Sequence, residues 1–112
     1  MRQAPIALVG RPGPARVQLA TYLRADGFDV RECRDTLPRR VSGVVIVDEH
    51  GASATLCRRV AAWLADGAAE RVVVISGRPA RWKELAADHG ARVVVLAAPV
   101  FGWHIADALR PR

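Results

Sequence analysis

Short apolar runs alternate with longer amphipathic stretches along the chain, and this alternation is the main structural signal in the sequence. Five apolar runs are typical of β-strands, because each is short and bounded by glycine or polar residues. The central run, Val44–Val47, is β-branched throughout, as expected of a parallel strand that is buried on both faces. The other predicted strands cover Pro5–Val9, Phe28–Cys33, Arg71–Ile75 and Arg92–Ala97.

Four stretches between or after these strands carry apolar residues at helical spacing. The predicted helices cover Pro14–Ala25, a segment capped by Ser53 or Thr55 that ends at Ala65, Pro79–His89 and Phe101–Leu109. Asp35–Val41 contains Pro38 and predicts a loop or a single turn. Strands that alternate with helices predict an α/β domain whose parallel sheet is covered on both faces. Any functional site is then expected at the carboxyl ends of the strands.

Length and composition narrow the class of protein. The 112 residues fit one domain, 1–112, which is long enough to bury a core. No apolar run approaches the roughly 20 residues that cross a bilayer, and the amino terminus lacks an apolar signal segment, so we expect a cytoplasmic protein without a membrane partner. The 17 basic and 11 acidic residues give a net charge of +6, but the arginines are scattered, and nucleic-acid binding by this domain is not expected. Cys33 and Cys57 lack redox or zinc spacing and are expected to be inert thiols.

In such a fold, the connections after the first, third, fourth and fifth strands converge. These connections begin with Gly10–Pro14, Asp48–Gly51, Ser76–Arg78 and Ala98-Pro99. The first connection lacks the second glycine, the lysine and the hydroxyl of a phosphate-binding P-loop, and its prolines make it a poor match to a dinucleotide-binding fingerprint. Adjacent residues such as Asp48, Glu49 and His50 rarely converge on one metal ion. The remaining candidate is an aspartate phosphoacceptor at Asp48, with a hydroxyl at Ser76 on the next strand.

Several segments resemble the receiver domains of two-component response regulators. "IALVGRPGPARVQLATYLRADGFDV", from Ile6 to Val30, resembles the receiver opening of strand, helix and strand. "VVIVD" resembles the strand that ends at the phosphoacceptor, here Asp48, and "VVVISGRPA" the strand that carries the switch Ser/Thr, here Ser76. "HGARVVVLAAPVF" resembles the segment that leads to the family's Lys-Pro pair. The resemblance implies a flavodoxin-like sandwich with a five-stranded parallel sheet in the order 2-1-3-4-5.

The chain departs from the family at the residues that carry phosphotransfer chemistry. Gly10 and Arg11 occupy the positions of the acidic pair that holds Mg²⁺ in receivers, so neither magnesium nor another cofactor is expected. The family's lysine position holds Ala98, which is followed by Pro99. Of the standard set, the chain keeps the aspartate and the switch hydroxyl. Because phosphoryl transfer depends on positioned cations, these departures argue against conventional phosphorylation.

The resemblance and the departures together predict a pseudo-receiver, which is not an enzyme and relays signals through protein–protein interaction. Asp48 would then be structural, its carboxylate held by strand-end amides or by Arg11. A sharper hypothesis has the Arg11 guanidinium replacing both metal and lysine, which would keep Asp48 ionised and fix one signalling state. Two alternatives stay open. One is a genuine receiver that a histidine kinase phosphorylates on Asp48, and the other is a nucleotide- or anion-binding module that uses Arg11 and Arg78.

The resemblance also implies where partners bind. Receivers commonly use the face formed by the fourth helix, the fifth strand and the fifth helix, where this sequence carries Trp82, Phe101 and Trp103. Core packing would account for one or two of these aromatic residues, whereas an exposed pair would indicate a binding face or a homodimer interface. We expect the partner to be another protein or a linked effector domain of a longer, transcription-regulating protein.

Overall fold

The computed structural model describes residues 5–34, 36–37, 40–48, 54–97 and 102–110. Within these residues, the strands form one parallel sheet in the order β2-β1-β3-β4-β5. The strands are β1 (Ile6–Val9), β2 (Val30–Cys33), β3 (Val41–Asp48), β4 (Ala69–Ser76) and β5 (Val93–Ala97). The helices are α1 (Pro14–Ala25), α2 (Ala54–Ala65), α3 (Lys83–His89) and α4 (Gly102–Leu109), with 3₁₀ turns η1 (Pro79–Trp82) and η2 (Gly90–Arg92). The predicted fold class and strand order are confirmed, and the architecture is consistent with a flavodoxin-like fold.

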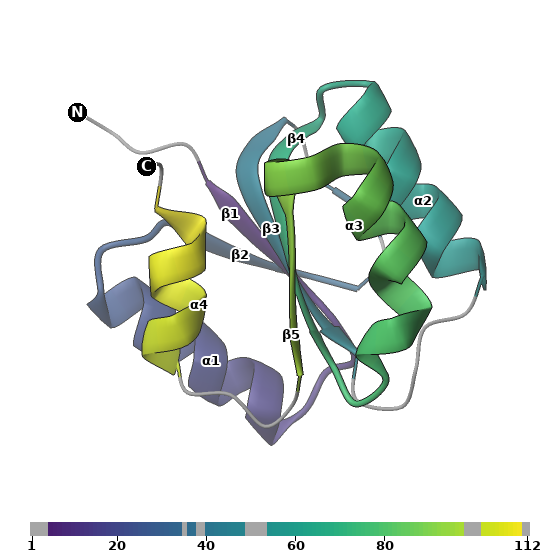
Figure 1. The fold of residues 1–112 in the computed structure, drawn as a ribbon. Coiled ribbons are helices and arrows are strands. Elements are labelled where there is room, and N and C mark those ends of the chain that lie inside the picture. Colours follow the sequence, from purple (N-terminus) through teal and green to yellow (C-terminus); the bar gives the residue numbers. More distant parts are fainter. Residues whose placement is uncertain (1–4, 35, 38–39, 49–53, 98–101, 111–112) are drawn as a thin grey trace.

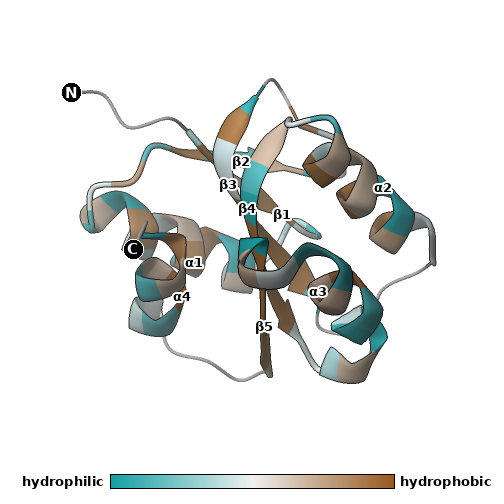
Figure 2. Ribbon diagram, turned by 45° about the horizontal axis from the view of Figure 1, so that its top comes forward, coloured by the Kyte–Doolittle hydropathy of each residue, from teal (hydrophilic) through white to brown (hydrophobic). Residues whose placement is uncertain are grey.

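The sheet separates two helical layers (Figure 1). Helices α1 and α4 cover one face, and α2 and α3 cover the other. Each face buries its own hydrophobic cluster, because successive strand residues point to opposite sides. In β3, for example, Val44 packs towards α2 and α3, whereas Val45 packs towards α1 and α4. Hydrophobic residues accordingly concentrate in the strands, and the helices are mixed in character (Figure 2).

The central strands are longer than the apolar runs that predict them. β3 begins at Val41 and includes Ser42 and Gly43, which contribute no large apolar side chain to the pattern. Gly43 nevertheless has a packing role, since a Cβ atom built there would lie 2.9 Å from Leu109 Cδ2 of α4. The absence of a side chain at this position lets α4 sit close to the sheet. Pairing with β4, from Val41 opposite Ala69 onwards, extends the strand beyond its apolar centre.

Two connections shape the edges of the fold. The predicted helix Pro79–His89 is divided into the 3₁₀ turn η1 and the helix α3, and the division falls at Trp82, whose side chain is fully buried. The described residues between β2 and β3 form no helix, as the sequence predicts, and Leu37 of this connection packs against the core on the α2 side. None of the helices in the described ranges is long and apolar enough to span a membrane.

Candidate functional site

Asp48 and Ser76 end the two longest strands and lie opposite each other in the ladder between β3 and β4. Both are buried, with exposed fractions of 7% and 0%. Ser76 Oγ donates a hydrogen bond to Asp48 Oδ2 over 3.1 Å, and it accepts one from the backbone N–H of Arg78 over 2.9 Å. The backbone N–H of Gly77 donates to the carbonyl oxygen of Asp48 over 3.2 Å. The two residues that the sequence singles out are therefore in contact. They also accept the backbone hydrogen bonds of Gly77 and Arg78, which follow β4.

A second side chain, Trp82, also donates to the Asp48 carboxylate. Its indole Nε1 lies 2.9 Å from Asp48 Oδ2, so one carboxylate oxygen accepts hydrogen bonds from two elements, β4 and η1. Trp82 is fully buried within the core on the α2 and α3 side. Trp82 is thus one of the aromatic residues that core packing accounts for, and its side chain is not part of an exposed interaction face. A buried indole needs an acceptor for its N–H group, and a buried carboxylate needs donors, so the two satisfy each other.

The two positions that correspond to the receiver's acidic pair have different surroundings. Arg11 is exposed, and its side chain forms no hydrogen bond or ion pair with any described residue. The hypothesis that its guanidinium holds Asp48 is thus not supported, because the donors found at this carboxylate are the Ser76 hydroxyl and the Trp82 indole. Gly10 lies against β3, where an added Cβ atom would approach Val47 Cβ to 3.2 Å. A larger residue at Gly10 would require Val47 to shift by a few tenths of an ångström.

Another arginine, Arg16, organises this edge of the sheet. Its Nη1 atom donates to the carbonyl oxygen of Gly10 over 2.8 Å and to that of Cys33 over 3.4 Å. Its Nε atom lies 3.2 Å from Glu32 Oε1, and only 15% of the side chain is exposed. Arg16 therefore joins the ends of β1 and β2. The sequence signal for this role is the position of Arg16 in the first turn of the predicted helix. A cation there interacts unfavourably with the helix dipole, so acceptors outside the helix are expected to offset that cost.

Neither cysteine behaves as an activated nucleophile. Burial raises the pKa of the Cys57 thiol above the ordinary value of 9.0, the negative charge of Asp48 raises this pKa further, and Arg81 lowers it. Burial also raises the pKa of the Cys33 thiol, against an opposing effect of Arg16. Because the thiolate is the reactive form, both groups stay protonated near neutral pH. This result agrees with the expectation of inert thiols.

Of the remaining sequence candidates, the structure describes Trp103. Trp103 on α4 is 58% exposed, and its ring lies 3.6 Å from that of His104. Its role in binding a partner stays a prediction. The other candidates of the predicted face and of the Lys-Pro position lie outside the described residues: Phe101, Ala98 and Pro99.

The described residues offer no ready metal site, since they contain no group of three or more His, Cys, Asp or Glu side chains that could hold an ion. The chemistry that the geometry supports is instead a buried carboxylate with two neutral donors, Ser76 and Trp82. Comparison with known proteins assigns no family, because no protein-family model and no curated protein matches the chain.

Proposed function

We propose that this chain is a pseudo-receiver, a signalling domain that acts through protein–protein interaction and in which Asp48 is structural and does not accept a phosphoryl group. The observation that carries the proposal is the double hydrogen bond to Asp48 Oδ2, from Ser76 Oγ and from Trp82 Nε1. Through these two hydrogen bonds, the carboxylate at the end of β3 connects this strand to β4 and to η1. The receiver resemblance of the sequence supports the signalling role, and the departures at Gly10 and Arg11 support the loss of phosphotransfer.

Electrostatics favour the structural role of the carboxylate. Phosphoryl transfer to a carboxylate brings together two anionic groups, and positioned cations normally neutralise the developing charge. Both donors to Asp48 Oδ2 are neutral, and Arg11 forms no ion pair with Asp48. The Trp82 indole also belongs to the hydrophobic core, so moving it away from Asp48 would expose a large apolar surface. Phosphorylation would therefore act against the packing of η1.

The proposal is tested by offering the chain a phosphoryl group. The protein is incubated with Mg²⁺ and acetyl phosphate, and separately with Mg²⁺ and beryllofluoride. Intact mass reports covalent modification, and the NMR signal of the Trp82 indole N–H reports the environment of Asp48. We expect neither signal to change. A Mg²⁺-dependent gain of one phosphoryl group that is lost in the Asp48→Asn variant would show instead a genuine receiver.

An anion-binding module is a second candidate, because the side chains of Arg11 and Arg78 are both exposed near the carboxyl edge of the sheet. A thermal-shift panel of nucleotides and inorganic phosphate tests it. Stabilisation that is lost on changing Arg11 and Arg78 to Gln would favour this function, whereas the pseudo-receiver predicts no stabilisation by any member of the panel.

A further inference from the structure

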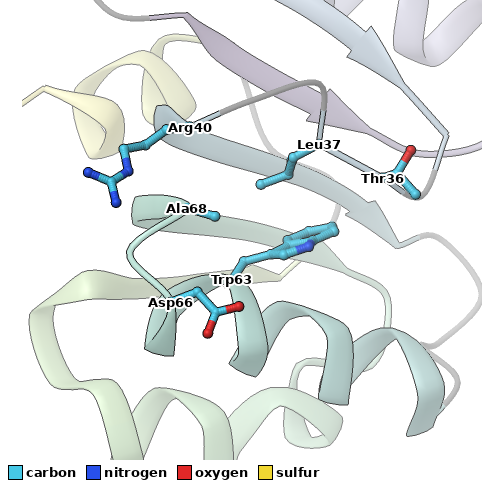
Figure 3. Close-up of a pocket in the computed structure, with 6 residues that line it drawn as sticks. All are labelled: Thr36, Leu37, Arg40, Trp63, Asp66 and Ala68. Carbon is cyan, nitrogen blue, oxygen red and sulfur yellow. The ribbon is translucent and has the colours of Figure 1, made fainter.

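A groove of about 460 Å³ lies beside the amino ends of β3 and β4, away from Asp48 (Figure 3). This volume falls within the range of roughly 300–1,000 Å³ that is typical of small-molecule sites. Arg40 directly precedes β3, Ala68 directly precedes β4, and Asp66 directly follows α2. The lining residues are Thr36, Leu37, Arg40, Trp63, Asp66 and Ala68.

The floor of the groove is apolar. Leu37 extends from the connection between β2 and β3, and Trp63 extends from α2, so that the two side chains approach each other in Figure 3. Both are half-buried and pack against the core on this face of the sheet. The described part of the connection contributes no helix over these side chains.

The charged end of the groove is formed by Arg40 and Asp66, both of which are exposed. A Cβ atom added to Gly67, the residue after Asp66, would lie 3.8 Å from Arg40 Nη2. The guanidinium thus sits next to the chain that carries the carboxylate. Even so, neither side chain forms a hydrogen bond or an ion pair with a residue that the structure describes. One positive and one negative side chain therefore line the same end of the groove, and no ion pair joins them.

We propose that this groove binds a small zwitterion with an apolar side chain, the chemistry of a free α-amino acid. The planar guanidinium of Arg40 matches the two oxygens of a carboxylate. Asp66 accepts the ammonium group, and the carboxyl end of α2 adds a favourable dipole for a cation. The apolar side chain of the ligand then lies over Trp63 and Leu37. This inference is independent of the pseudo-receiver proposal, because none of its residues contacts Asp48 through a hydrogen bond.

The charges favour a zwitterion over a simple ion. A purely anionic ligand would place its charge beside Asp66, and a purely cationic ligand would place its charge beside Arg40. Because no ion pair joins Arg40 to Asp66, a ligand that binds between them has no such contact to break. A ligand that carries both charges a few ångströms apart uses both side chains at once, and gains from the apolar floor as well.

The test measures binding to the whole chain by isothermal titration calorimetry and by NMR shifts of the Trp63 indole N–H signal. The ligands are L-leucine and L-phenylalanine at up to roughly 10 mM, a range that detects millimolar affinity. N-acetyl-L-leucine lacks the ammonium and resembles the carboxyl end of a peptide, and L-leucinamide lacks the carboxylate and resembles the amino end. We expect at least one free amino acid to bind and shift the Trp63 signal, and both blocked analogues to bind about tenfold more weakly or not at all.

Matched variants locate the site. Arg40→Gln and Asp66→Asn each remove one charge of the groove, and we expect each to weaken amino acid binding about tenfold without loss of folding. Arg58→Gln and Asp88→Asn make the same changes at exposed positions outside the groove and should leave binding unchanged. The proposal is overturned if neither amino acid binds, if a blocked analogue binds as tightly as its parent, or if the groove variants bind like the controls.

Discussion

Asp48→Asn should destabilise this protein, and the sign of that effect separates a structural carboxylate from a phosphotransfer site. The substitution preserves the shape of the side chain and removes its negative charge. In a pocket where an aspartate faces further carboxylates, the same change relieves repulsion and stabilises the fold. Here the donors to the Asp48 carboxylate are Ser76 and Trp82, so the charge strengthens two hydrogen bonds.

The expected magnitude follows from these two contacts. A hydrogen bond to a charged group contributes about 1.5–3 kcal/mol to stability, and one between neutral groups about 0.5–1.5 kcal/mol. Exchanging both bonds from charged to neutral acceptors therefore costs about 2.5 kcal/mol. Because Asp48 is only 7% exposed, water recovers little of this loss. With a slope of about 1–3 kcal/mol per molar urea for a small domain, the urea midpoint should fall by about 0.8–2.5 M.

Equilibrium urea unfolding followed by circular dichroism measures this change, with Asp88→Asn as the exposed control that should stay within about 0.5 kcal/mol. A double-mutant cycle with Trp82→Phe isolates the contact between the two side chains. The cycle should give a coupling free energy of about 1–3 kcal/mol, since Trp82 and Asp48 interact directly. An unchanged or raised midpoint for Asp48→Asn would refute the structural role of this carboxylate.

Arg16, Gly43 and Cys57 each give a further prediction. Arg16→Met should lower the free energy of unfolding by about 1–3 kcal/mol, because it removes the hydrogen bonds to the ends of β1 and β2. In the same urea assay, the control Arg11→Met should change this free energy by less than about 0.5 kcal/mol. Gly43→Ala should cost about 1–3 kcal/mol by differential scanning calorimetry, since its Cβ would crowd α4 at 2.9 Å; an unchanged melting temperature would contradict this packing. Asp48→Asn should lower the pKa of the Cys57 thiol by removing a repulsive charge, so that alkylation by iodoacetamide begins at lower pH, and an unshifted pH profile would argue against this electrostatic contact.

Much of the fold could be predicted from the sequence, because each element carries its own local signal. α1 begins at Pro14 and ends at Ala25, as predicted, since a proline in the first turn and Gly27 just beyond the end mark both limits. The ends of β3 and β4, in contrast, carry no such local signal in the sequence. Their outer residues are held by pairing with each other, and a pairing between distant segments leaves no periodic pattern in either one.

The candidate site was predicted in part. Asp48 and Ser76 could be paired from the sequence because both end apolar strands that lie side by side in this kind of fold. The role of Trp82 could not, because its apolar spacing predicts a helix face, and only the tertiary structure shows which acceptor its N–H group reaches. The sequence analysis singled out Arg11 by its position. The structure shows instead that the side chain of Arg16 donates to the carbonyl oxygens at the ends of β1 and β2.

The ladder between β3 and β4 also has a consequence for the order of folding. In the described residues, α2 is the helix that connects the two strands. They form the longest run of paired residues in the described sheet, from Val41–Ala69 to Asp48–Ser76. Trp82 follows β4 directly and docks on the last rung of this ladder. Burial of its indole should therefore accompany the docking of η1 on the completed β3-β4 pair. In a Trp63→Phe, Trp103→Phe variant, which keeps Trp82 as its single tryptophan, stopped-flow emission should report this step of folding.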